Sequence, residues 1–178
     1  MNWKTISTEY ISRHRYFTAR KDVCEKPDGG IVEAYYVVEL PATVCAVAIT
    51  EDNEVIMVRQ YRHPVAESLV ELPGGFADEG EDPATAVARE LLEETGYKFN
   101  EYIPLGRVAA NPGVLNNYTY LFLATGGKHI GPQQLDDNEE IDLIFLPIKK
   151  VKAMLENNEI VQALNVSCLY YAFTKLGI

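Results

Sequence analysis

The chain has 178 residues and a mass of 20.0 kDa, which fits a single domain with a sizeable hydrophobic core. Its 47% hydrophobic and 24% charged residues are typical of a globular protein, and the formal net charge of −10 argues against a nucleic-acid partner. Three widely spaced cysteines without a CxxC pair indicate neither a disulfide framework nor a zinc site, and the lack of a long apolar run predicts a cytoplasmic protein without a membrane partner.

Strand-forming segments fill the first part of the chain. Residues 16–26 and 31–39 flank the turn signal PDGG (27–30), so they predict an antiparallel β-hairpin. Apolar runs predict further strands at 42–50, 54–62 and 68–73.

A helix is predicted at 83–95, because Asp82 is a favoured N-cap, Pro83 suits the first helical position and Gly96 suits the end. The remaining expected elements are strands at 104–110, 117–124 and 140–147 and helices at 148–157 and 159–176. This order favours a mixed sheet covered by helices over a regular βαβ array.

The helix at 83–95 carries an unusual density of acids. Glu90, Glu93 and Glu94 stand at i, i+3 and i+4, so three carboxylates gather on neighbouring positions and should repel one another. A hard cation such as Mg²⁺ or Mn²⁺ would relieve that repulsion, and Arg89 can pair with Glu93. The apolar positions expected to be buried are Ala84, Val87, Ala88 and Leu91.

Taken alone, this acidic cluster is weak evidence for a metal site, and a solvated helix face is the favoured interpretation. The spacing of the whole segment 75–97 is more specific, since it reads G-x5-E-x7-R-E-L-L-E-E-T-G-Y. It resembles the signature of the Nudix hydrolases, G-x5-E-x7-R-E-U-x-E-E-x-G-U with U bulky and apolar, and Tyr97 stands where an aliphatic residue is usual.

The resemblance implies an α/β (α+β) fold, the Nudix α/β/α sandwich around a mixed sheet, in one domain over residues 1–178. Residues 41–178 would form the core, and residues 1–40 would form a β-region involved in a homodimer. Carried over by position, the implied Mg²⁺ ligands are Glu90 and Glu94, with Glu93 in support and the Gly74 carbonyl as a further ligand, while Glu81 and Arg89 hold the loop and helix in register.

Residues outside the signature resemble the branch that cleaves ADP-ribose and other nucleoside diphosphate sugars. In RQYRH (59–63), Arg62 is the first choice and Arg59 the second for contacting the diphosphate, although a strand-end arginine can also be a plain surface residue. Pro112 in NPGVLNN (111–117) resembles a marker of this branch, and the loop could line a sugar pocket through Asn111, Asn116 or Asn117.

The N-terminal region resembles the part of this branch that contacts the nucleobase, which gives Trp3 and Arg20 as candidates; a Trp packed at the edge of the core is an equal alternative. Glu140, and after it Glu139, is a candidate catalytic base, with an acidic solvated loop as the alternative. Glu93 is a further candidate for taking a proton from water.

The predicted activity is Mg²⁺-dependent hydrolysis of the diphosphate bond of a nucleotide sugar, first ADP-ribose, giving AMP and ribose 5-phosphate. The alternatives are GDP-mannose or another nucleotide sugar as substrate, or a sensor module that binds a nucleotide sugar without cleaving it. The complete set of carboxylates favours the enzyme.

Overall fold

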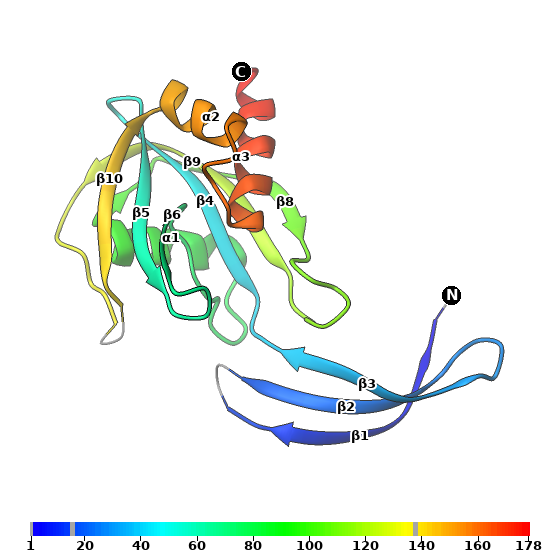
Figure 1. The fold of residues 1–178 in the computed structure, drawn as a ribbon. Coiled ribbons are helices and arrows are strands. Elements are labelled where there is room, and N and C mark those ends of the chain that lie inside the picture. Colours follow the sequence, from blue (N-terminus) through cyan, green and yellow to red (C-terminus); the bar gives the residue numbers. More distant parts are fainter. Residues whose placement is uncertain (1, 15–16, 137–138) are drawn as a thin grey trace. The chain divides into compact units, whose positions relative to one another are not determined.

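The computed structural model describes residues 2–14, 17–136 and 139–178 (Figure 1). Its contacts divide the chain into two compact units. One comprises Met1–Pro41 and Ala109–Tyr118, and the other comprises Ala42–Val108 and Thr119–Ile178. No helix within the described ranges is long and apolar enough to cross a membrane.

The first unit is built on an antiparallel sheet in the order β1-β2-β3, with β1 at Lys4–Ser12, β2 at Thr18–Glu25 and β3 at Ile31–Glu39. The predicted hairpin is confirmed as β2 and β3, although residue 16 of the predicted strand lies outside the described residues. The strand β1 was not predicted, because its segment KTISTEYIS has no apolar face, and in the structure the strand is almost entirely exposed. Pairing with β2 orders it instead.

The loop at 109–118 pairs with the end of β3. The Val38 amide donates to the Val114 carbonyl at 2.8 Å, and the Asn116 amide donates to the Val38 carbonyl at 3.2 Å. The Asn116 side chain accepts from the Leu40 amide at 3.0 Å, and the Asn117 side chain donates to the Pro41 carbonyl at 3.0 Å. These asparagines therefore serve first to hold the loop against the strand.

The second unit contains a seven-stranded mixed sheet with the central order β10-β5-β4-β9-β7, with β6 paired to β5 and β8 paired to β9. The strands β4 and β9 run parallel, and the other pairs are antiparallel, so the predicted mixed sheet is confirmed. The strands are β4 (Thr43–Thr50), β5 (Glu54–Arg62), β6 (Glu67–Glu71), β7 (Tyr97–Lys98), β8 (Glu101–Val108), β9 (Thr119–His129) and β10 (Ile141–Pro147).

Several predicted boundaries were wrong. The strand expected at 104–110 is β8 at Glu101–Val108, and the strand expected at 117–124 is β9 at Thr119–His129. The helix expected to begin at 159 begins at Ala163, because Asn158 has a φ of 58° and Gln162 forms the N-cap by accepting from the Asn165 amide. Strand pairing and capping side chains therefore determine where these strands and helices begin and end, which the apolar pattern of the sequence does not show.

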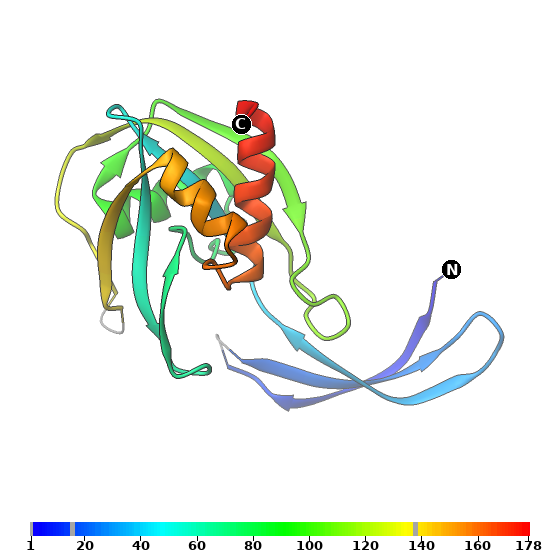
Figure 2. The ribbon, with the colours of Figure 1, turned by 45° about the horizontal axis from the view of Figure 1, so that its top comes forward.

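Helices cover both faces of this sheet (Figures 1 and 2). The helix α1 (Pro83–Thr95) packs on one face, and α2 (Ile148–Glu156) and α3 (Ala163–Leu176) pack on the other. Alternate residues of β4 supply the two cores, since Val44 and Ala46 belong to the α1 cluster while Cys45 and Val47 belong to the α2 and α3 cluster. A strand buried on both faces reads as a continuous apolar run, as VCAVAIT does.

The predicted bounds and caps of α1 are confirmed. The Asp82 side chain accepts from the Ala84 and Thr85 amides, and Gly96 ends the helix in the left-handed conformation with a φ of 72°. The predicted buried stripe was partly wrong, because Ala84 is exposed and Ala88 is only half-buried. The alanines at 84, 86 and 88 are all apolar, so the sequence does not decide which of them faces the core. The buried residues are Ala86, Val87, Leu91, Glu94 and Thr95.

Candidate active site

The loop between β6 and α1 is fixed against β4 by its backbone. The Ala46 amide donates to the Pro73 carbonyl at 3.2 Å, and the Val44 amide donates to the Gly75 carbonyl at 2.9 Å. Gly74 has a φ of 146°, and a Cβ on it would lie 2.2 Å from the Val44 carbonyl oxygen, so only glycine fits at this position.

This loop contacts two of the acids on α1. The Gly74 amide donates to Oε2 of Glu94 at 2.8 Å. A Cβ on Gly75 would lie 2.5 Å from Oε2 of Glu90, so the absence of a side chain there leaves room for that carboxylate. The two glycines thus bring the backbone up to Glu90 and Glu94.

Arg89 contacts three acids of the site, Glu81, Glu90 and Glu93. Its Nε and Nη2 donate to the two carboxylate oxygens of Glu81 at 3.1 and 2.9 Å, and Nη2 also donates to the Phe76 carbonyl at 3.0 Å. Its Nη1 donates to Glu90 at 2.9 Å and to Glu93 at 3.0 Å, which confirms the expected pairing with Glu93. The hydrogen bond from Arg89 lowers the pKa of Glu81, and the bond to Glu81 is the largest cause that raises the pKa of Arg89.

Burial disfavours the charged form of two of the α1 acids. Desolvation raises the pKa of Glu94 to about 8, with repulsion from Glu90 and Glu139 adding to the effect and the Gly74 amide opposing it. Desolvation likewise raises the pKa of Glu90 to about 7, opposed by Arg89 and reinforced by Glu93 and Glu139. These carboxylates therefore lack sufficient positive charge nearby, although Arg89 contacts one of them.

This donor set fits a hard divalent cation. Mg²⁺ is typically bound by one or two protein carboxylates, and it keeps water and substrate phosphate oxygens as its other ligands. Glu90 and Glu94 supply two such carboxylates, while Glu93 is held by Arg89 and its side chain is 40% exposed. Among the residues that the structure describes, no three His, Cys, Asp or Glu side chains converge to form a complete protein cage.

The two candidate diphosphate arginines lie on opposite faces of the sheet, because side chains alternate along β5. Arg62 shares the α1 face with Ile56, and its Nε and Nη2 each lie 2.8 Å from Oε2 of Glu71. The positive charge of Arg62 also lowers the pKa of Glu94, so this guanidinium acts on the same site. Arg59 lies in register with Asp142 of β10 on the other face.

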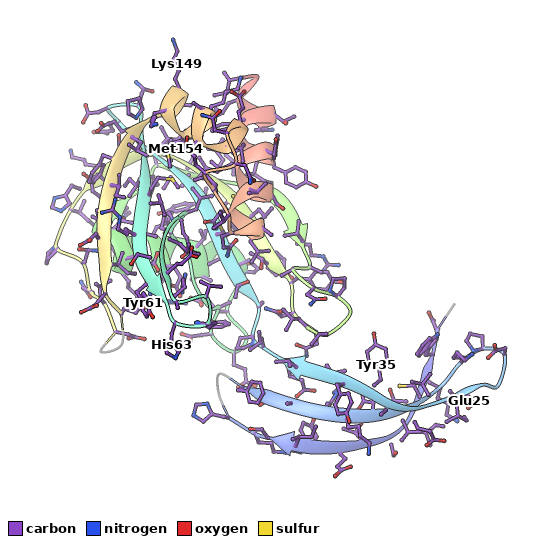
Figure 3. The ribbon with its side chains drawn as sticks, viewed as in Figure 1. Glu25, Tyr35, Tyr61, His63, Lys149 and Met154 are labelled. Carbon is purple, nitrogen blue, oxygen red and sulfur yellow. The ribbon has the colours of Figure 1, made fainter. Side chains whose placement is uncertain are left out.

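A cavity of about 450 Å³ lies where β5 ends and where β6 and β10 begin. Figure 3 labels Tyr61 and His63 at this end of β5, with ring centroids 6.3 Å apart. Glu139 lines the cavity, accepts from the Asp136 amide at 3.1 Å and repels the carboxylates of α1. Other polar residues around the cavity are Arg59, Tyr61, Ser68, Glu140 and Asp142.

The remaining predicted substrate residues belong to the first unit. Trp3 is 45% exposed and packs edge-on against Tyr35, with ring centroids 6.0 Å apart. Arg20 pairs with Glu39 at 2.5 Å and with Asp22 at 3.2 Å. Asn111 and Pro112 are exposed, and Asn116 caps the end of β3.

Sequence reasoning missed the buried partner of Arg62. Glu71 is 2% exposed, yet nothing in the segment SLVELP distinguishes it from a solvated strand residue. No local signal marks it, because the register of β5 and β6 decides which face it occupies. Glu71 pairs with Val58, so it lies on the same face as the even-numbered positions of β5, including Arg62.

Comparison with known proteins adds independent information. The NUDIX domain model matches residues 39–164, and the nucleoside diphosphate sugar hydrolase N-terminal domain model matches residues 3–38. A methanol dehydrogenase activator from Bacillus methanolicus is 35% identical over 94% of this chain and 91% of its own length. An ADP-ribose pyrophosphatase from Mycobacterium tuberculosis is 32% identical over 93% of this chain and 81% of its own length.

A solved structure of an ADP compounds hydrolase matches with a TM-score of 0.85 and 22% sequence identity. The match covers 99% of this chain and 95% of that structure. This likeness, together with the NUDIX domain match, confirms the predicted fold class.

The raised pKa of Glu94 predicts a specific pH dependence of stability. Between about pH 4.5, the ordinary value, and about pH 8, folded Glu94 holds a proton that the unfolded chain has lost. Metal-free protein should therefore lose stability as the pH rises through this window, by up to about 1.4 kcal/mol per pH unit for one proton. The check is the thermal unfolding midpoint in EDTA from pH 5 to pH 9.

The matched variant is Glu94→Gln, which should show a shallower fall in the midpoint because the titrating group is gone. Equal slopes in the two proteins would contradict the assignment of a buried, proton-binding Glu94.

Proposed function

Because the chain belongs to the Nudix domain family and is a Nudix pyrophosphohydrolase, we propose that it cleaves the diphosphate bond of a nucleoside diphosphate sugar, with ADP-ribose as the first choice. The observation that carries this proposal is the pair of desolvated carboxylates, Glu90 and Glu94, beside the Gly74 amide and Arg62. The N-terminal match to a nucleoside diphosphate sugar hydrolase domain supports the substrate class.

Nudix hydrolases generally use divalent metal ions, and Mg²⁺, with Mn²⁺ as a substitute, is the proposed cofactor here. Glu90 and Glu94 would hold it, with Glu93 and the carbonyl of Gly74 as the further ligands expected from the sequence. A bound Mg²⁺ would neutralise charge on the phosphoryl oxygens and acidify an attacking water.

The chain's own residues would do the binding and the proton transfer. Arg62 would bind the diphosphate, since Glu71 fixes its Nε and Nη2 and leaves its Nη1 free of that ion pair. A carboxylate oxygen of Glu93, Glu139 or Glu140 would take the proton of the attacking water. Glu139 has the support that its charge already acts on Glu90 and Glu94. Water would add to one phosphorus of ADP-ribose, releasing AMP and ribose 5-phosphate.

The roles of Trp3 and Arg20 at the nucleobase, and of Asn111, Pro112 and Asn116 in a sugar pocket, stay predictions. So do the cytoplasmic location and the homodimer. For the dimer, the exposed apolar residues on the strands of the N-terminal sheet are supporting observations. These residues are Ile6, Tyr10, Ile11, Ile31 and Tyr36.

The proposed function is tested by turnover of a substrate panel with Mg²⁺, with EDTA as the control. The panel contains ADP-ribose, GDP-mannose, other nucleotide sugars, dinucleoside polyphosphates, NADH and nucleoside triphosphates. We expect metal-dependent cleavage of ADP-ribose to AMP and ribose 5-phosphate, with slower cleavage outside the nucleotide sugars. Faster cleavage of GDP-mannose would select that alternative, and binding of nucleotide sugars without any turnover would favour the sensor module.

Glu94→Gln should lower kcat by at least about 100-fold, because it removes the charge of a proposed metal ligand while keeping the shape of the side chain. Its thermal midpoint at pH 8 should equal or exceed that of the unchanged protein, because the buried charge of Glu94 is gone. Glu79→Gln, on the exposed part of the same loop, is the matched control and should keep full activity. Full activity in Glu94→Gln would remove Glu94 from the site.

Arg62→Ala and Arg59→Ala should differ, because the two arginines lie on opposite faces of the sheet. We expect kcat/KM to fall by about 100-fold or more for Arg62→Ala, since a charged contact between a guanidinium and a phosphate is lost and the buried Glu71 is left unpaired. Arg59→Ala should change kcat/KM by only a few-fold. The reverse order of effects would show that the diphosphate lies on the Arg59 face.

A further inference from the structure

We propose that Asn165 of α3 is a positioning residue for the metal and diphosphate site, and that it acts from the opposite face of the sheet through the backbone at residues 71–74. The identity of the ligands rests on the proposed function. The contacts that carry the inference are independent of it.

Asn165 is buried, with 3% of its surface exposed. It links α3 to β4 and to the residue that follows β6. Its Oδ1 accepts from the Leu72 amide at 2.8 Å, and its Nδ2 donates to the Cys45 sulfur at 3.6 Å. The backbone amide of Asn165 donates to Oε1 of Gln162 at 2.9 Å, which fixes the first turn of α3.

The surroundings of Asn165 are apolar. Cys45, Leu72, Cys168 and Leu169 all belong to the core cluster between the sheet and α3. A buried amide in such a cluster is costly unless its polar atoms are paired, and both ends of this one are. An aliphatic side chain could fill the same space. What Asn165 adds is its two hydrogen bonds, which fix the positions of the Leu72 amide and the Cys45 sulfur.

The Leu72 amide needs a partner because β6 leaves the sheet at this point. The last residue of β6 is Glu71, which pairs with Val58 of β5, and Leu72 has no strand partner beyond it. Asn165 supplies the missing acceptor. It therefore sets where the chain turns from the strand into the loop before α1.

That turn carries two groups of the proposed site. Immediately before Leu72, Glu71 holds the guanidinium of Arg62. Two residues after it, the Gly74 amide holds the carboxylate of Glu94 at 2.8 Å. Asn165 is thus one residue from the anchor of the diphosphate arginine and two residues from the anchor of a proposed metal ligand.

The loss of the Asn165 acceptor should loosen the Gly74 amide from Glu94 and weaken metal binding more than folding. In Asn165→Leu, which has the same number of side-chain heavy atoms, the Leu72 amide would be unpaired. In Asn165→Asp, an oxygen remains where the amide needs an acceptor. Ser167→Ala is the matched control, because Ser167 is on the same helix, is partly exposed and donates locally to the Ala163 carbonyl.

The experiment measures Mn²⁺ affinity by electron paramagnetic resonance and amide hydrogen exchange of Leu72 and Gly74 in the metal-free protein. We expect Asn165→Leu to weaken Mn²⁺ binding by about 10-fold or more, the range typical of residues that orient metal ligands, and to speed exchange at both amides. Asn165→Asp should recover most of both properties, and Ser167→Ala should match the unchanged protein.

A lowered thermal midpoint in Asn165→Leu with unchanged Mn²⁺ affinity and unchanged Gly74 exchange would overturn the proposal, because it would make Asn165 a purely structural residue. If Asn165→Leu does not fold, Asn165→Ser, whose hydroxyl is too short to reach the Leu72 amide, carries the same expectation. An unchanged protein that binds Mn²⁺ but cleaves no nucleotide sugar would refute the proposed function and leave the positioning role standing.

Discussion

The burial of two carboxylates on one helix is the constraint around which the second unit is organised. Glu94 is 6% exposed and its pKa is about 8, so a charge there is unfavourable in the protein by itself. The surrounding chain reduces this cost at several points. Gly74 donates its amide to Glu94, Arg89 donates to Glu90, and Arg62 places a positive charge nearby. The proposed divalent cation would complete the compensation, which would tie a metal requirement to the burial of these acids.

The fold makes this burial possible because it supports the site from both faces of the sheet. The loop at Gly74 is bonded to the backbone of β4, in which every residue after Thr43 is buried. On the face opposite α1, α3 reaches the same loop through Asn165. The strand β5 separates two environments, since Arg62 lies on the face of α1 and its acids and Arg59 lies beside the cavity at the start of β10. The site therefore depends on elements that are far apart in the sequence.

Local signals made part of this structure predictable. The helix α1 matched its expected bounds because Asp82, Pro83 and Gly96 are themselves the capping residues. What the sequence left undecided depends on long-range contacts. The burial of Glu94 rather than Glu93 follows from which face of α1 meets Gly74, and the Arg62 and Glu71 pair follows from the register of β5 and β6. The strand β1 escaped prediction because its order comes from pairing and not from an apolar face.

The central claim, that these acids are protonated when metal-free and deprotonated when they bind a cation, is tested most directly by proton release on metal binding. Calorimetric titration of Mg²⁺ into the protein, in buffers of different ionisation enthalpy, measures that release without any substrate. With the pKa of Glu94 at about 8 and that of Glu90 at about 7, Glu94 is mostly protonated and Glu90 about half protonated at pH 7, so binding should release between one and two protons per ion, and the release should disappear above about pH 9. Mg²⁺ binding with no proton release at pH 7 would contradict the claim.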